Sequence, residues 1–184
     1  MNICIDPGHS GPCEPGACAA QCRESDVTMG ISQLIAKMLI KQGHSVTLTR
    51  TGEIDDDGLT WRAEMANEIG ADIFVSIHCN SYTSEKAHGT ETWYFTGSEA
   101  GQALARCIQS GVVEAVGSTD RGAKATEGLT VLRVSECPAV LAELGFLSNP
   151  EERAELTDLL LRRRYAVGVV TGIEAWGEEQ KKHF

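Results

Sequence analysis

Three short apolar segments of this chain each end in a residue that can bind a metal or transfer a proton. Residues 3–5 precede Asp6-Pro7-Gly8-His9, residues 73–77 precede His78, and residues 139–142 precede Glu143. Short apolar runs bounded by Gly, Pro, Asn or Ser are typical of buried strands. Strand ends in an open α/β sheet meet at one crevice, where ligands bind. Two His and one Glu at such ends indicate a metal site.

The third protein ligand of such a site should be an acid. Zinc sites that catalyse reactions commonly use two His and one carboxylate, and they leave one position for water. Glu14 and Glu24 both follow His9. Glu24 begins the next predicted helix, where regular structure would orient its side chain and the helix dipole favours a negative charge. Taken alone, His9 also fits a surface loop and His78 also fits a hydrogen-bonded core histidine.

The apolar pattern predicts the elements that must position these residues. We expect helices over residues 25–42, 61–69, 98–116 and 158–176, with a further helix start at Asn149-Pro150. We expect strands over residues 2–6, 44–49, 73–78, 90–95, 129–133 and 139–144, and loops over residues 51–59 and 118–126. The alternation predicts an α/β fold with a single mixed, mostly parallel sheet and helices on both faces. With short connections, residues 1–184 are expected to form one domain.

Charge and hydropathy exclude several classes of partner. The formal net charge of −10 argues against nucleic acid, which requires clustered Lys and Arg. No apolar stretch approaches the roughly 20 residues that a membrane-spanning helix needs. Met1 and Asn2 lead directly into the first strand without a basic or apolar leader, so we expect no signal peptide and no membrane insertion. The chain is then either made in the cytoplasm or cut from a longer protein.

Seven Cys are present, and three of them share one Gly/Ala-rich loop. Cys13, Cys18 and Cys22 could be free thiols, form a disulfide or hold a second metal, but their spacing matches no common iron–sulfur motif. In the loop over residues 51–59, Asp55, Asp56 and Asp57 lack the alternating pattern of a calcium site, so we interpret the loop as solvated. His183 belongs to a polar tail.

Taken together and in order, several motifs resemble the zinc-dependent N-acetylmuramoyl-L-alanine amidases, the amidase type 3 family of bacterial cell-wall hydrolases. They extend over nearly the whole chain, and only their combination is specific. The motifs are Ile5-Asp6-Pro7-Gly8-His9, Glu14-Pro15-Gly16-Ala17, Arg23-Glu24-Ser25-Asp26-Val27, Leu48-Thr49-Arg50, Arg62-Ala63 with Ala66-Asn67, Ser76-Ile77-His78-Cys79-Asn80-Ser81 and Glu143-Leu144-Gly145-Phe146-Leu147-Ser148-Asn149-Pro150.

The resemblance implies the reaction and the roles of the residues. One Zn²⁺ per chain would be bound by His9, Glu24 and His78, with Glu24 selected over Glu14. The reaction would hydrolyse the amide between N-acetylmuramic acid and the L-alanine of the peptidoglycan stem peptide. Glu143 would be the general base, and Asn80 and Arg133 are candidates for binding substrate. We expect a monomer that acts on the bacterial cell wall, outside the cell or at host lysis. A separate wall-binding module could accompany it.

Two departures and two alternatives accompany the resemblance. Ser10 stands where the family usually has Gly, and the three Cys fall between the first two ligands. Some members block the site with a helix inserted after the fourth strand, whereas here only Thr96 and Gly97 separate that strand from the next helix. The alternatives are a zinc carboxypeptidase-like peptidase and an inactive wall-binding module. The biological role stays open between an endolysin, a sporulation or germination enzyme and an autolysin that separates daughter cells.

Overall fold

A computed structural model of the chain describes residues 1–55 and 58–182. Asp56 and Asp57, expected in a solvated loop, and His183, expected in a polar tail, lie outside the described residues. Within the described ranges, no helix combines the length and the apolar character needed to cross a bilayer.

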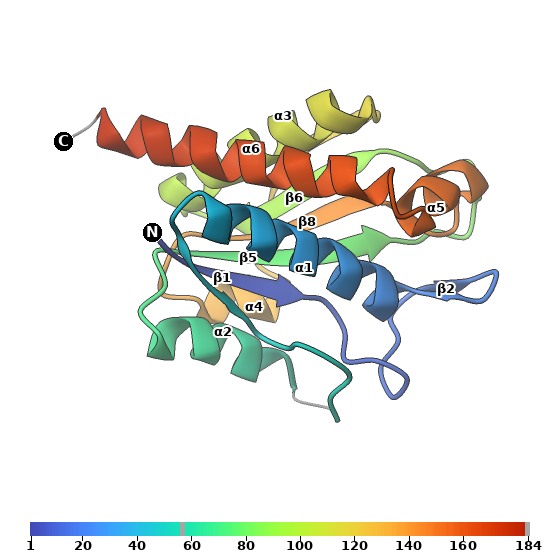
Figure 1. Ribbon diagram of the computed structural model, residues 1–184, viewed down its shortest axis with the longest axis horizontal. Coiled ribbons are helices and arrows are strands. Elements are labelled where there is room, and N and C mark those ends of the chain that lie inside the picture. The colour runs from blue at the N-terminus through green and yellow to red at the C-terminus, as the bar shows by residue number, and fades with distance from the viewer. Residues whose placement is uncertain (56–57, 183–184) are drawn as a thin grey trace.

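A six-stranded sheet forms the centre of the molecule (Figure 1). Its strands are β1 (Asn2–Pro7), β4 (Ser45–Leu48), β5 (Ile73–Asn80), β6 (Thr90–Phe95), β7 (Asp120–Thr126) and β8 (Ala139–Phe146). They lie in the order β4-β1-β5-β8-β6-β7, and only the pair β8–β6 is antiparallel. The predicted mixed, mostly parallel sheet is therefore confirmed. A separate two-stranded hairpin consists of β2 (Cys18–Ala19) and β3 (Cys22–Arg23).

Helices cover both faces of the sheet, as predicted. One layer contains α1 (Glu24–Lys41), α3 (Glu99–Val116) and α6 (Arg162–Lys181), in which α6 packs against both α1 and α3 (Figure 1). The opposite layer contains α2 (Gly58–Glu68) and α4 (Thr130–Val134), and α5 (Pro150–Thr157) follows β8. Only residues 96–98 join β6 to α3, so the described chain carries no helix inserted at that position.

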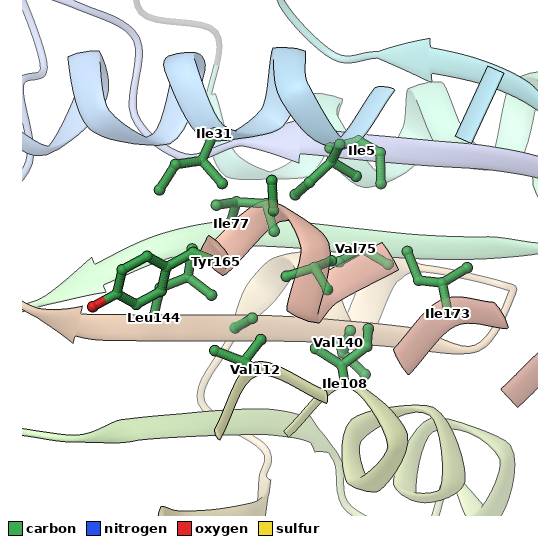
Figure 2. Close-up of a cluster of buried hydrophobic side chains, with 14 of the residues drawn as sticks. Ile5, Ile31, Val75, Ile77, Ile108, Val112, Val140, Leu144, Tyr165 and Ile173 are labelled. Atoms are coloured by element: carbon green, nitrogen blue, oxygen red, sulfur yellow. The ribbon is translucent and has the colours of Figure 1, made fainter. Parts of the chain in front are cut away.

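The main core lies between the sheet and the layer of α1, α3 and α6. Figure 2 shows Val75 and Val140 of the sheet facing Ile31 of α1, Ile108 of α3 and Ile173 of α6. Each of these side chains is 5% exposed or less, and burying such a group contributes roughly 1.5–3 kcal/mol relative to leaving it in water. This packing holds the strands in one register and thereby places their ends.

A smaller core covers only the first part of the strands on the other face. There Phe74 and Leu141 pack with Val131 and Leu132 of α4. Side chains alternate between the faces of a strand, so His78 and Glu143 lie on this same face, further along β5 and β8. The part of the face beyond α4 therefore carries the chemistry-bearing residues.

Three predicted elements were wrong. Residues 129–133, expected as a strand, lie mostly in the short helix α4, whose Val131 and Leu132 are buried in the smaller core. Residues 118–126, expected as a loop, contain β7, an edge strand that pairs its backbone with β6 and carries few apolar residues. The last helix begins at Arg162 and not at residue 158, because Asp158 accepts hydrogen bonds from the backbone of Leu160 and Leu161 outside the helix.

Candidate metal and catalytic site

The turn after β1 presents His9 at the end of the sheet. His9 has a φ of 65°, a left-handed conformation that costs a non-Gly residue energy and persists only where the surroundings enforce it. The neighbouring Ser10 does not share a positive φ, so the backbone there does not require the Gly that is usual in the resembling family. The strained backbone conformation therefore occurs at a candidate metal ligand.

Two buried arginines hold this turn in place. Arg50 donates to the carbonyl oxygens of Pro7 and Gly8 at 2.9 Å each and to that of Ser25 at 2.8 Å, and so ties the turn to the start of α1. Arg62 donates to the carbonyl oxygens of Pro7 and His9 at 2.9 Å. Both arginines belong to the motifs that carry the family resemblance, but the motifs do not indicate that these residues hold the turn.

Asp6 supports the second arginine from inside the sheet. Its carboxylate is 2.7 Å from Arg62 and also accepts hydrogen bonds from Thr49 and Ser76 at 2.6 Å each. Burial alone would raise the pKa of Asp6, but Arg62 and the two hydroxyls outweigh it and lower that pKa. Asp6 therefore stays ionised and acts as a structural partner, leaving the metal-ligand role to other acids.

Glu24, the first residue of α1, lies between the two histidines. Its Oε2 is 2.9 Å from Nε2 of His9, and its Oε1 is 3.0 Å from Nδ1 of His78. The same oxygens accept the backbone N–H groups of Ala17 at 2.9 Å and Cys79 at 2.8 Å. Burial alone would raise the pKa of Glu24, but the hydrogen bonds from His78 and His9 lower it well below its usual range.

Glu14 occupies a different place from Glu24. Its carboxylate contacts Nδ1 of His9 at 2.7 Å, on the side of the ring that faces away from Glu24. A carboxylate on one ring nitrogen fixes the tautomer and orientation of a metal-binding histidine. Glu14 and Glu24 therefore both contact His9, through different ring nitrogens.

The donor set fits a metal ion. Ligand atoms of His9, Glu24 and His78 all lie within 4.8 Å of one another, and no other such group of His, Cys, Asp or Glu occurs among the described residues. Two glycines leave room for them. A Cβ on Gly16 would lie 2.4 Å from the His9 ring, and one on Gly8 would lie 2.5 Å from the His78 ring. Two imidazoles and one carboxylate are a donor set that zinc favours.

Glu143 faces the same space from the neighbouring strand. It lies opposite His78 in the register of β5 and β8. Its Oε2 is buried and has no hydrogen-bond partner in the described part of the chain. Burial raises the pKa of Glu143 to about 7, with Glu24 and Glu91 adding to the rise and His78 opposing it. An acid with this pKa can accept and return a proton near neutral pH.

Asn80 and Arg133 lie in different surroundings. Asn80 follows a register shift in β5 and donates through Nδ2 to Glu91 at 2.9 Å. Glu91 itself lies opposite Glu143 in the register of β6 and β8. Arg133 is exposed at the end of α4 and lines a separate hollow with Pro138 and Ala139, near the start of β8. The structure thus connects Asn80 to the neighbourhood of Glu143 and places Arg133 elsewhere.

Sequence reasoning missed Glu91 altogether. Glu91 is buried and pairs with Arg121 at 2.8 Å and Lys124 at 2.6 Å, both from β7. The only signal in the sequence is an acid inside a predicted strand, and its partners lie on β7, whose sequence predicts a loop.

The three cysteines of the long loop lie near the hairpin β2–β3. All seven cysteines of the chain are free thiols in the structure. Cys22 is half-buried against the core, whereas Cys13 and Cys18 are exposed. The structure therefore gives no disulfide to this loop.

Taken together, a doubly covered α/β sheet, a His-Glu-His donor set and a neighbouring buried acid are typical of metal-dependent hydrolases. Comparison with known proteins agrees with this class and narrows it. A family profile described as N-acetylmuramoyl-L-alanine amidase matches residues 3–175, and the chain belongs to this family of peptidoglycan amidases.

Individual relatives agree with the family. The germination-specific N-acetylmuramoyl-L-alanine amidase of Bacillus subtilis (strain 168) is 29% identical, over 93% of this chain and 77% of the relative. The crystal structure of an N-acetylmuramoyl-L-alanine amidase from Clostridium difficile 630 is 34% identical with a TM-score of 0.90, over 96% of both chains. The CwlD amidase from Clostridioides difficile, solved in complex with the GerS lipoprotein, is 28% identical with a TM-score of 0.91, over 96% of this chain and 98% of that one.

Proposed function

We propose that this chain hydrolyses the amide between the lactyl group of N-acetylmuramic acid and L-alanine of the stem peptide, with one Zn²⁺ held by His9, Glu24 and His78. The observation that carries the proposal is the convergence of these three donors beside the unpartnered buried oxygen of Glu143. Membership of the amidase family supports the choice of bond. Residues 1–184 would act as one catalytic domain and as a monomer.

The proton transfers fall to Glu143. His9, Glu24 and His78 would hold Zn²⁺, which would supply the Lewis-acid chemistry for activating a water and polarising the amide carbonyl. Glu143 accepts the proton of the attacking water, for which its unpartnered Oε2 and its pKa of about 7 are suited. It then donates this proton to the L-alanine nitrogen as the C–N bond breaks. The products are a lactyl carboxylate and a peptide with a free amino terminus.

Neighbouring groups orient these residues. Glu14 contacts Nδ1 of His9, and the other ring nitrogen, Nε2, faces Glu24 in the proposed metal site. Asn80 contributes through its hydrogen bond to Glu91, beside Glu143. Arg133 lies by another hollow, so the proposed mechanism gives it no role.

The site is proposed to work without an activator protein, on the bacterial cell wall. The short connection between β6 and α3 leaves no inserted helix that a partner would have to displace. The relative CwlD was solved with a lipoprotein bound, so this independence is a property to be tested for the present chain.

One experiment tests the function and separates the alternatives. Purified protein is analysed for metal and then incubated with peptidoglycan, and new amino termini are identified. We expect about one zinc per chain and release of peptides that begin with L-alanine. Release of C-terminal amino acids would favour a carboxypeptidase, and wall binding without hydrolysis would favour an inactive module. Full hydrolysis by metal-free protein would refute the role of zinc.

A further inference from the structure

A row of ionisable residues extends across the sheet from the proposed zinc site to two cationic side chains on the edge strand. His78, Glu143 and Glu91 follow one another across β5, β8 and β6 in direct register. Beyond Glu91, the edge strand β7 contributes Arg121 and Lys124. The proposed metal site and this pair of cations therefore lie on opposite sides of Glu143.

Glu91 holds the two cations in place but does not neutralise both. Its Oε2 accepts from Nε of Arg121 at 2.8 Å and from Nζ of Lys124 at 2.6 Å, while its Oε1 accepts from Asn80. One carboxylate against two cations leaves a formal charge of +1. In the described part of the chain, neither cation pairs with another acid. A local excess of positive charge is notable in a chain whose formal net charge is −10.

Both cations keep donors that face solvent. The side chains of Arg121 and Lys124 are 36% and 35% exposed, whereas that of Glu91 is 6% exposed. Cζ of Arg121 also lies 5.0 Å from the centre of the Phe146 ring, and Nζ of Lys124 lies 5.3 Å from the centre of the Trp93 ring. Aromatic contacts and a buried anchor restrict both side chains, so little entropy is lost when a ligand binds. Over the described ranges, Nη2 of Arg121 donates no hydrogen bond, and Lys124 donates one of its three.

The distance from the reacting bond suits a group on the leaving peptide. Neighbouring strands lie about 5 Å apart, so charge held over β6 is about one strand spacing from Glu143 on β8. One residue of extended chain spans about 3.5 Å, so the residue after L-alanine reaches this point. Where this residue carries a carboxyl group outside the peptide chain, that group is negatively charged when free and neutral when amidated.

On these observations we propose that Arg121 and Lys124, anchored by Glu91, form a subsite for the free carboxylate of the second stem-peptide residue. The inference rests on the proposed function and adds a choice between two forms of the substrate. Charge-assisted hydrogen bonds to a carboxylate are stronger than those to a neutral amide. The enzyme therefore prefers stem peptides whose second residue is not amidated.

The test compares two soluble muropeptides that differ only in this group, a carboxylate or a carboxamide. With zinc-loaded protein, we expect kcat/KM to be about 10-fold higher for the carboxylate form, and the preference to shrink as salt is raised. The double variant Arg121→Gln/Lys124→Gln should lose the preference, so that its kcat/KM is the same for the carboxylate and carboxamide forms. Arg106→Gln removes an exposed cation from α3, on the other face of the sheet, and should keep the preference.

The results distinguish failure of the subsite alone from failure of the amidase proposal. Equal cleavage of both substrates by the unaltered protein overturns the subsite and leaves the amidase proposal standing, as does a double variant that keeps the preference. Cleavage of neither substrate by the zinc-loaded protein overturns the amidase proposal and the subsite with it. If the double variant does not fold, inhibition of the unaltered protein by the released peptides decides, with the carboxylate peptide expected to inhibit more strongly than its carboxamide.

Discussion

Replacing Glu143 by Gln should separate its proposed role from that of a ligand. The substitution keeps the shape of the side chain and removes its ability to accept a proton. We expect kcat to fall about 100-fold or more, the usual scale of general acid–base catalysis, while bound zinc is retained. The matched variant Glu24→Gln should lose zinc first, because a neutral amide is a poorer ligand and Glu24 lies between both histidines.

The same substitution has a predictable effect on stability. Burial raises the pKa of Glu143 from 4.5 to about 7, so its carboxylate is disfavoured in the folded state. For a raised pKa, this group's contribution to stability is fully present below pH 4.5 and is lost as the pH rises through 7. At about 1.4 kcal/mol per pH unit, the difference between a pKa of 4.5 and one of about 7 corresponds to roughly 3–4 kcal/mol. The uncharged Gln avoids this loss.

Urea unfolding of metal-free protein at two pH values measures the effect. At pH 8, Glu143→Gln should be more stable than the unaltered protein by up to about 3–4 kcal/mol, and at pH 4 the two should be nearly equal. If the stability difference between the variant and the unaltered protein were the same at both pH values, Glu143 would not be desolvated. If Glu143→Gln lost its zinc while Glu24→Gln kept it, the two proposed roles would have to be exchanged.

Three further outcomes follow from the structure. Gly16→Ala should weaken zinc affinity about 10–100-fold in a metal titration, because the added Cβ would clash with the His9 ring and displace this ligand. Gly43→Ala, also at a positive φ but with open space around it, should cost stability only. Replacing Cys13, Cys18 and Cys22 together by Ala should leave the zinc content unchanged. Loss of a second bound metal in that variant would contradict this prediction. Purified protein should cleave soluble muropeptide without a partner, and a lag that ended only when a partner protein was added would count against an open site.

The fold class was predictable because its signals are local. Apolar runs of strand length alternate with helical periodicity, and α/β architecture follows from that alternation. The failures were also local in origin. The edge strand β7 lacks an apolar pattern because its side chains are exposed or only half-buried at the margin of the sheet. α4 is a helix because tertiary packing of Val131 and Leu132 outweighs strand propensity.

The sequence by itself determined which residues stand at the strand ends, and hence that His9, His78 and Glu143 would be brought to one region. Only the tertiary structure decided how they meet. Glu14 and Glu24 contact opposite nitrogens of His9, and Glu91 gathers Asn80, Arg121 and Lys124 next to Glu143. The physical reason is that strand periodicity sets the face on which a side chain lies. The distances between side chains, their burial and their pKa values depend on neighbours that are remote in sequence.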